Sequence, residues 1–281
     1  KKRSTAEAVL NELKQKHPLP ELVLNYRKLY KLKNTYLDPL PSYIIEYTHR
    51  VHSSFNQTMT ATGRLSTSSP NFQNIPIRTE DGKEIRKAIK AQSHEYQIFS
   101  ADYSQVELRV MAHLSGDESL ISALNNGEDI HTFTAKNIFN VDNDDMVLPE
   151  MRRIAKIVNF GIMYGAGPFR LSQELDIPFG EAKQIKDAYF QKYQGIEKYI
   201  ENSKLQIKET KSVETLLGRR RAVWDSDSQN KIRRDAAERM AINMPIQGTA
   251  AEMIKLAMIK IHRQMNKENL KSKLIMQIHD E

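Results

Sequence analysis

Two short apolar segments, far apart in the sequence, each lead into a carboxylate. Residues 97–101 (QIFSA) precede Asp102, and residues 274–278 (LIMQI) lead through one residue to Asp280 and Glu281. Short apolar runs of this kind are typical of buried strands. If the two strands pair, they place Asp102 and Asp280 side by side at one edge of a small antiparallel sheet. The fold must then depend on pairing between distant parts of the chain.

Adjacent carboxylates repel one another unless a cation neutralises them. The chain contains no cysteine, so a metal ion can be held only by oxygen or imidazole ligands, and oxygen ligands favour magnesium or manganese. Two such ions, about 3.5–4 Å apart, can activate an attacking oxygen and stabilise a leaving one. From the residues alone, two simpler interpretations stay open: Asp102 caps the helix that follows it, and the terminal acids are a polar chain end.

The remaining sequence is dominated by helical periodicity, with Gly, Pro, Asn and Asp at the breaks. The predicted elements are, in order, two helices over 1–37 split near HPLP, strands within 43–60, an ordered loop over 60–78, a strand and helix over 97–117, mostly helical residues over 118–210, a basic loop at 217–221, a long helix over 229–266 and a final strand. Pro245 has no N–H to donate, so we expect it to interrupt the long helix.

Composition is that of a globular protein, and its basic charge is compatible with a polyanionic partner. Of the 281 residues 40% are hydrophobic and 27% charged, and the net charge is +7, which is compatible with binding to nucleic-acid phosphates. No apolar run is long enough to cross a membrane, and the first residues, KKRSTAEAVLNELKQ, lack the apolar core of a signal peptide. We therefore expect a cytoplasmic protein with no membrane partner.

A stripe of cations and rings lies within residues 151–167. Arg152, Lys156, Phe160 and Tyr164 recur every four residues, so on a helix they share one face with the cations toward its N-terminus. An arginine fork and a lysine point charge suit phosphates, and the rings that follow suit a sugar and a base. The alternative is an ordinary helix with its rings in the core and its cations in water.

Three long motifs resemble one enzyme family. DYSQVELR (102–109), RRIAKIVNFGIMYG (152–165) and the terminal HDE resemble the A, B and C motifs of family A DNA polymerases, the bacterial DNA polymerase I type. TATGRLSTSSPNFQNIPIR, DIHTFTA, TLLGRRR and RMAINMPIQGTAAEMIK also resemble that family's segments and follow in its order. Several long motifs in the right order argue against chance agreement.

The resemblance implies an α+β, right-hand polymerase fold with a small antiparallel palm sheet, helical fingers and a partial thumb. Its implied domains are the C-terminal part of the thumb (1–42), the first part of the palm with motif A (43–115), the fingers with the motif B helix at 150–165 (116–228) and the second part of the palm ending at motif C (229–281). It also implies a strand and a short helix after HDE, and more of the thumb before residue 1. Trp224 departs from the family pattern, in which a proline is usual.

The activity that the resemblance implies is template-directed addition of deoxynucleotides to a primer 3′-hydroxyl, in DNA replication and repair. Its implied partners are primer–template DNA and deoxynucleoside triphosphates, and the protein is expected to be a monomer, nucleoid-associated if bacterial; a phage or organellar origin is also compatible. Asp102, Asp280 and the main-chain carbonyl of Tyr103 would bind two Mg²⁺ ions, with Mn²⁺ as a possible substitute, and Glu281 would support them.

The remaining site residues are also implied by the resemblance. Arg152, Lys156 and His131 would grip the triphosphate, and Lys156 would protonate the leaving pyrophosphate. Phe160 would pack on the sugar, and Tyr164 would lie near the templating base.

Glu107 would be a steric gate that leaves no room for a ribose 2′-hydroxyl, next to Gln105, which is also assigned to nucleotide binding. Arg64, Asn243 and Gln247 would read acceptors in the minor groove near the primer end. Arg239 would lie close by, toward the template.

Two other functions remain as alternatives. A single-subunit RNA polymerase of the phage type shares the palm and the motif B arrangement, although Glu107 and the wording of DYSQVELR argue against it, and nucleotide selectivity would decide. A non-catalytic DNA-binding module on the same fold would bind duplex DNA without magnesium-dependent extension.

Overall fold

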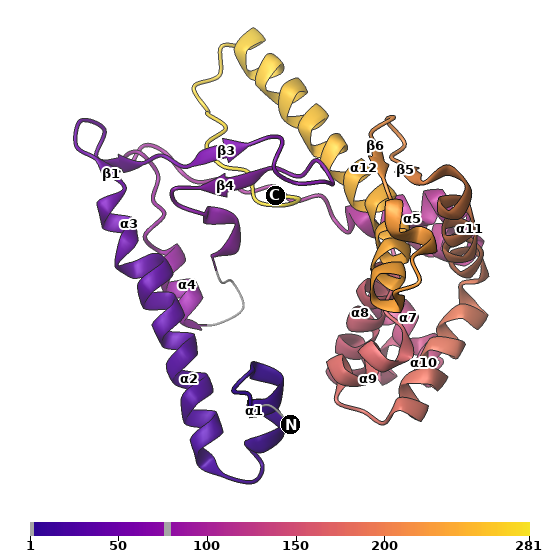
Figure 1. Cartoon of the computed structure of the whole chain (residues 1–281). Coiled ribbons are helices and arrows are strands. Elements are labelled where there is room, and N and C mark those ends of the chain that lie inside the picture. The colour runs from indigo at the N-terminus through magenta and orange to yellow at the C-terminus, as the bar shows by residue number, and fades with distance from the viewer. Residues whose placement is uncertain (1–2, 76–79) are drawn as a thin grey trace.

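The computed structural model describes residues 3–75 and 80–281. The last positions of the expected loop over 60–78, residues 76–78, lie outside the described residues. In Figure 1 the first helices stand on one side and the helices from the middle of the sequence form a mass on the other, with a strand hairpin and the C-terminal segment between them.

Twelve α-helices account for most of the described structure. They are α1 (Glu7–Leu13), α2 (Pro18–Leu32), α3 (Pro39–Ser42), α4 (Glu80–Arg86), α5 (Val106–Ser115), α6 (Glu118–Asn125), α7 (Ile130–Phe139), α8 (Pro149–Met163), α9 (Pro168–Leu175), α10 (Phe179–Lys192), α11 (Gln194–Thr210) and α12 (Lys231–Lys267). The split near HPLP and the breaks expected within 118–210 are confirmed at the ends of these helices.

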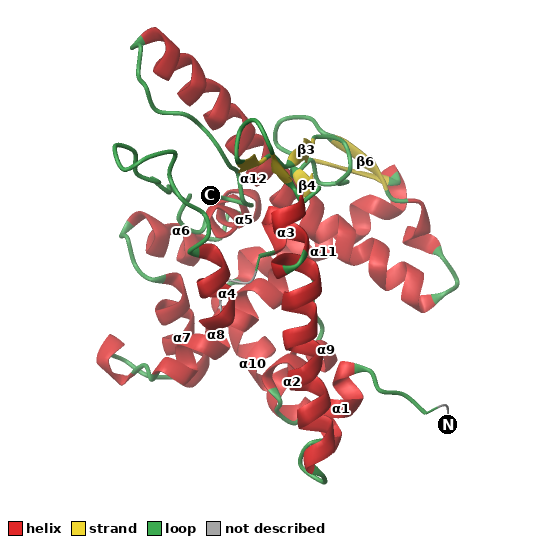
Figure 2. Ribbon diagram, turned by 90° about the vertical axis from the view of Figure 1, so that its left-hand side faces the viewer, coloured by secondary structure: helices red, strands yellow, loops and turns green. Residues whose placement is uncertain are grey.

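The strands form three antiparallel hairpins. They pair β1 (Ile44–Ile45) with β2 (Arg50–Val51), β3 (Ser54–Asn56) with β4 (Ser66–Ser68), and β5 (Ser212–Glu214) with β6 (Arg220–Ala222). In Figure 2 the labelled strands, in yellow, gather toward one end of a molecule that is otherwise helix and loop. The mixed class with small antiparallel sheets is therefore confirmed.

Local chemistry explains where the helices near the candidate site begin and end. Asp117 and Asp129 are the N-cap residues of α6 and α7, and their carboxylates accept hydrogen bonds from Leu120 N (2.9 Å) and Thr132 N (2.7 Å). Gly116 ends α5 with φ +61°, a conformation that glycine adopts without strain. These caps fix the turns between α5, α6 and α7.

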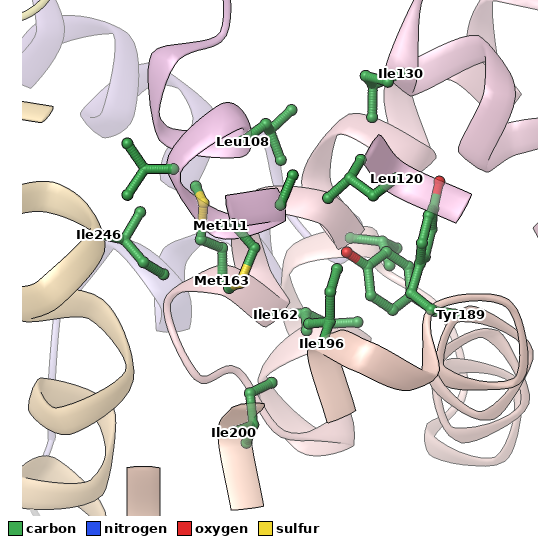
Figure 3. Packing of buried hydrophobic residues seen from close by; sticks show 14 of the residues in the cluster. Leu108, Met111, Leu120, Ile130, Ile162, Met163, Tyr189, Ile196, Ile200 and Ile246 are labelled. Atoms are coloured by element: carbon green, nitrogen blue, oxygen red, sulfur yellow. The ribbon is translucent and has the colours of Figure 1, made fainter. Parts of the chain in front are cut away.

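The main core is formed by side chains from all the helices α5 to α12. Figure 3 shows Met111 of α5, Met163 of α8 and Ile246 of α12 within this cluster, and each is at most 1% exposed. A fully buried side chain of this size contributes roughly 1.5–3 kcal/mol to stability. The core therefore fastens α5, which follows Asp102, to α8, which carries the stripe of cations and rings.

The strands expected at 97–101 and 274–278 are not formed. Within the described residues a single backbone hydrogen bond, from Tyr103 N to Asp280 O (3.2 Å), joins the two segments. Phe99 is 90% exposed and Ile275 is 60% exposed, so the apolar residues cover no sheet face. Without a ladder of bonds or a buried face, two segments do not make a stable sheet.

The prediction that Pro245 interrupts the long helix is also wrong, because α12 runs unbroken through this residue. Pro245 cannot donate to the carbonyl of Ala241, four residues earlier. Its neighbours Met244 and Ile246 are 1% and 0% exposed. Packing of these side chains on both sides of the proline outweighs the missing hydrogen bond.

No helix among residues 3–75 and 80–281 has both the length and the hydropathy of a membrane span.

We predict that Gly195→Ala destabilises the fold by about 1–3 kcal/mol, because a Cβ there would lie 2.7 Å from the backbone Cα of Asp117. Gly180 occupies the same second position in α10 that Gly195 occupies in α11, and a Cβ on Gly180 meets no atom within 4 Å. The control Gly180→Ala should be neutral or stabilising by up to about 1 kcal/mol. Urea unfolding measures both, and equal effects would contradict the prediction.

Candidate active site

The structure brings the acidic ends of the two apolar segments together without a sheet. The backbone bond from Tyr103 N to Asp280 O joins them, and the hydroxyl of Ser100 donates to Glu281 Oε1. Asp102 is exposed and the side chain of Asp280 is 30% exposed. The acid-bearing ends of the two segments therefore lie together just before α5, held by single contacts, and Asp280 and Glu281 act electrostatically on Asp102.

The protein environment disfavours the charged forms of both aspartates. Partial burial, followed by repulsion from Asp280 and Glu281, raises the pKa of Asp102 above its ordinary value. Burial also raises the pKa of Asp280; Glu107 adds to this effect, whereas Arg64 and His279 oppose it. Such a cluster gains stability when a cation approaches.

The donor set fits a magnesium ion only as part of a larger ligand shell. In the part of the chain that the structure describes, no three His, Cys, Asp or Glu side chains are grouped as a metal site. Asp102 and Asp280 supply two hard oxygen donors, and Mg²⁺ commonly takes one or two carboxylates and completes its shell with water and substrate phosphates. These residues can take part in such a site but cannot enclose an ion alone.

Glu107 is the buried carboxylate of α5, and its hydrogen bonds link three segments of the chain. It is 4% exposed, and it accepts hydrogen bonds from Arg64 Nη2 (2.5 Å) and the Tyr164 hydroxyl (2.7 Å). Arg64 Nη2 also lies 3.8 Å from Asp280 Oδ1. Burial and the nearby Glu107 raise the pKa of Tyr164 well above its ordinary value, so the phenol stays protonated and donates.

Gln105 precedes α5 in a left-handed conformation (φ 54°) and is half-buried. This conformation is uncommon for a residue other than glycine and marks the tight turn between Asp102 and the helix. The turn lets the chain carry Asp102 on the surface while Glu107 points into the structure.

The expected stripe lies on α8 and its C-terminal cap. The ring centroids of Phe160 and Tyr164 are 6.2 Å apart, and the Phe160 ring lies 5.7 Å from the ring of His131 on α7. Lys156 is exposed and, among the described residues, forms no salt bridge, whereas Arg152 is paired with Asp129 (2.7 Å). Of the two cations in the stripe, Lys156 is thus exposed to solvent and Arg152 is paired with a carboxylate. The two rings of the stripe, Phe160 and Tyr164, are half-buried.

His131 is a buried, neutral imidazole. It is 4% exposed, and burial lowers its pKa to about 4; Lys156 and Arg152 act in the same direction, against Asp129. Its Nδ1 lies 3.1 Å from Asn159 Nδ2. Because that amide nitrogen only donates, Nδ1 accepts and the ring carries its proton on Nε2.

Asn159 is held in turn by a buried chain of hydroxyls. Thr134 Oγ1 lies 3.2 Å from Asn159 Oδ1, 3.1 Å from Asn159 Nδ2 and 2.9 Å from the hydroxyl of Tyr193. All three side chains are at most 1% exposed. This network holds the Asn159 amide in place beside His131.

The residues expected to contact DNA lie on α12 and the loop before β4. Arg239, Asn243 and Gln247 are spaced by four residues on one helix and share a face. A Cβ on Gly165 would lie 2.9 Å from Arg239 Cγ, so the end of α8 packs directly on α12 at that residue. Within the described residues, Asn243 Oδ1 is buried and accepts no hydrogen bond.

The same helix reaches the loop that carries Arg64. A Cβ on Gly248 would lie 3.3 Å from Thr62 O and 2.6 Å from Thr215 Cγ2. Helix α12 therefore connects the end of α8 to the loop of Arg64, and it carries the other three DNA candidates.

Sequence reasoning missed Asp129 and Asn159. Asp129 was detectable as an N-cap, since an aspartate directly before a helical pattern is the standard signal. Asn159 was detectable as a polar residue among the buried positions of an amphipathic helix. Neither signal identifies the partner, which comes from a different helix.

The whole chain, residues 1–281, matches the model of the family described as DNA polymerase family A. It is 51% identical over 280 residues to a thermostable DNA polymerase I of Thermus aquaticus, covering 100% of this chain and 33% of that protein. It is 46% identical over 278 residues to DNA polymerase I of Bacillus subtilis (strain 168), covering 99% and 32%. The chain thus spans about a third of the length of these relatives.

A solved structure is also similar to this chain. The POL domain of Pol1 from M. smegmatis, in complex with DNA primer-template and dNTP, superposes with a TM-score of 0.90 at 42% identity. The match covers 97% of this chain and 48% of that one. This likeness confirms the expected polymerase fold.

We predict that His131 makes stability depend on pH between its unfolded pKa, near 6.5, and its folded pKa of about 4. Because the folded pKa is the lower one, the unfolded state binds the proton first, and stability is lost as the pH falls through this window. Wild type should lose about 3 kcal/mol more than His131→Gln between pH 7 and pH 4. Urea titrations measure this, with exposed His113→Gln as control. Parallel pH profiles for wild type and His131→Gln would contradict the buried neutral ring.

Proposed function

Because the chain belongs to DNA polymerase family A, we propose that it catalyses template-directed addition of deoxynucleoside triphosphates to the 3′-hydroxyl of a DNA primer. The observation that carries the proposal is the meeting of Asp102 and Asp280 at the start of α5, in the fold that also presents the α8 stripe. The similar polymerase domain was solved with primer-template and dNTP. Both ligands are therefore the proposed partners of this chain.

Asp102, Asp280 and the carbonyl of Tyr103 would hold two Mg²⁺ ions, or Mn²⁺ in their place. When bound, the ions would assist deprotonation of the primer hydroxyl and neutralise charge on the leaving pyrophosphate. Glu281, held by Ser100, adds negative charge beside Asp102 and supports the site. The raised pKa values of the two aspartates are consistent with a site that a cation stabilises.

Arg152, Lys156 and His131 would hold the triphosphate. His131 would act as a neutral Nε2–H donor, because Asn159 occupies its Nδ1. Lys156, an exposed cation of α8, would donate a proton to the departing oxygen of pyrophosphate. Aligning the reacting groups in this way provides a large part of the rate acceleration.

Glu107 would exclude ribose by filling the space under the sugar C2′. Its two hydrogen bonds, to Arg64 and Tyr164, hold the carboxylate in one position. Phe160 would pack on the sugar and Tyr164 would lie near the templating base, while Gln105 would contribute to nucleotide binding from the turn before α5.

Arg64, Arg239, Asn243 and Gln247 would contact the DNA, the first from its loop and the others from α12. The free Oδ1 of Asn243 has capacity for a further hydrogen bond. Residues 1–42 would be part of the thumb, 43–115 and 229–281 the palm, and 116–228 the fingers. We also propose that the enzyme is a cytoplasmic monomer that acts in replication and repair; the bacterial DNA polymerase I relatives support the location and the role.

Asp102→Asn should reduce primer extension with magnesium and all four deoxynucleotides by about a hundredfold or more, because it removes a charge that acts on the reacting centre. The exposed Asp142→Asn is the matched control and should extend like wild type. Fluorescence anisotropy of labelled primer-template checks that both variants bind DNA. Wild-type protein that binds DNA but does not extend it would support the non-catalytic module.

Glu107→Ala should raise incorporation of ribonucleotides relative to deoxynucleotides by at least about tenfold, because it opens the space for a 2′-hydroxyl. Glu107→Gln keeps the volume and should retain most of the selectivity. Single-nucleotide extension with matched ribo and deoxy substrates measures the ratio. Unchanged selectivity in the alanine variant would reject the gate, and a wild-type preference for ribonucleotides would favour the RNA polymerase alternative.

A further inference from the structure

Within residues 3–75 and 80–281, the guanidinium of Arg152 is bound along only one of its edges. Its Nε donates to Asp129 Oδ1 (3.2 Å) and its Nη2 donates to Asp129 Oδ2 (2.7 Å). Arginine has five N–H donors. The opposite edge, formed by Nη1 and the second hydrogen of Nη2, remains available for another fork-shaped contact.

Asp129 is itself fixed in place. It is the N-cap of α7, and its Oδ1 accepts from Thr132 N at 2.7 Å. A carboxylate is also favoured at the positive end of the helix dipole. Burial opposes ionisation, but the hydrogen bonds from Arg152 and Thr132 lower its pKa to about 2, so Asp129 is an anion at all ordinary pH values.

Arg152 lies near the other phosphate candidates. His131 follows Asp129 by two residues, and its ring interacts electrostatically with Arg152 and Lys156. Lys156 lies one helical turn after Arg152 on α8. One cap residue of α7 therefore fixes the arginine of α8 beside the histidine of its own first turn.

We propose that Asp129 is a positioning residue, which holds Arg152 so that its Nη1–Nη2 edge faces the triphosphate. An exposed arginine that is free to rotate must lose rotamer freedom when it binds phosphate, and a guanidinium held beforehand loses less. In the competing role, Asp129 blocks Arg152 and so weakens triphosphate binding. This role requires phosphate to use the Nε–Nη2 edge, which Asp129 already holds. The inference rests on the proposed function of this site.

The same helix contains a matched control pair. Arg153 Nε donates to Glu150 Oε2 (2.9 Å) and Arg153 Nη2 donates to Glu150 Oε1 (2.6 Å), the same edge geometry one residue further on. Both partners lie within α8 and are exposed, so this pair does not connect to α7. Removing its carboxylate tests the general effect of a lost surface ion pair.

The test uses Asp129→Asn, which removes the charge but keeps a good N-cap for α7. We expect the KM for deoxynucleotides to rise about tenfold with kcat changed less than twofold. The Kd for inorganic triphosphate with magnesium, measured by calorimetry, should rise by the same factor. Glu150→Gln should change none of these values. A Kd that is unchanged or lower in Asp129→Asn overturns the inference, and a lower one assigns the competing role.

Two further variants keep the outcomes distinct. If the Kd for inorganic triphosphate is unchanged in Arg152→Ala, the proposed nucleotide site itself is rejected. If Arg152→Ala weakens triphosphate binding and Asp129→Asn does not, only the role of Asp129 is rejected. Thermal unfolding confirms that each variant is folded, and Asp129→Ser, which also caps a helix without charge, replaces the asparagine variant if that one is unstable.

Discussion

The buried carboxylate of Glu107 is the interaction on which the arrangement of the site depends. A charge with 4% exposure is tolerated only when it is well paired. Its two partners come from the loop before β4 and from the C-terminal cap of α8, so the requirement to satisfy one carboxylate fixes three segments relative to one another. Through Arg64 the same requirement reaches Asp280, at the far end of the chain.

The site residues of opposite charge lie on different elements. The acids near the start of α5 gather negative charge that the protein only partly neutralises, and α8 carries the cations Arg152 and Lys156. Under the proposed function, the phosphates of a nucleotide would face the cations of α8, and a divalent cation would face the acids. A nucleotide and a metal ion would then bind as one unit.

The sequence predicted most of the helices, the class of the fold and the contact between the segments that carry Asp102 and Asp280. These features depend on local periodicity, on caps and on motif resemblance, all of which are visible in a single chain. It did not predict the absence of strands at 97–101 and 274–278, or the unbroken helix at Pro245, because both outcomes depend on which surfaces become buried. The partners of Arg152 and His131 were missed for a related reason: Asp129 and Asn159 belong to different helices from the residues they hold.

Helix α12 has 37 residues, which corresponds to a rod of about 55 Å. Its first half is fastened to the core at Ala241, Met244 and Ile246, whereas Leu256, Ile259 and Ile261 are each close to half exposed, and Figure 1 shows this end extending away from the body. A single continuous helix thus crosses from a tightly packed to a loosely packed environment. Its backbone amides will exchange with deuterium along a gradient, slowly near Pro245 and progressively faster toward Lys267.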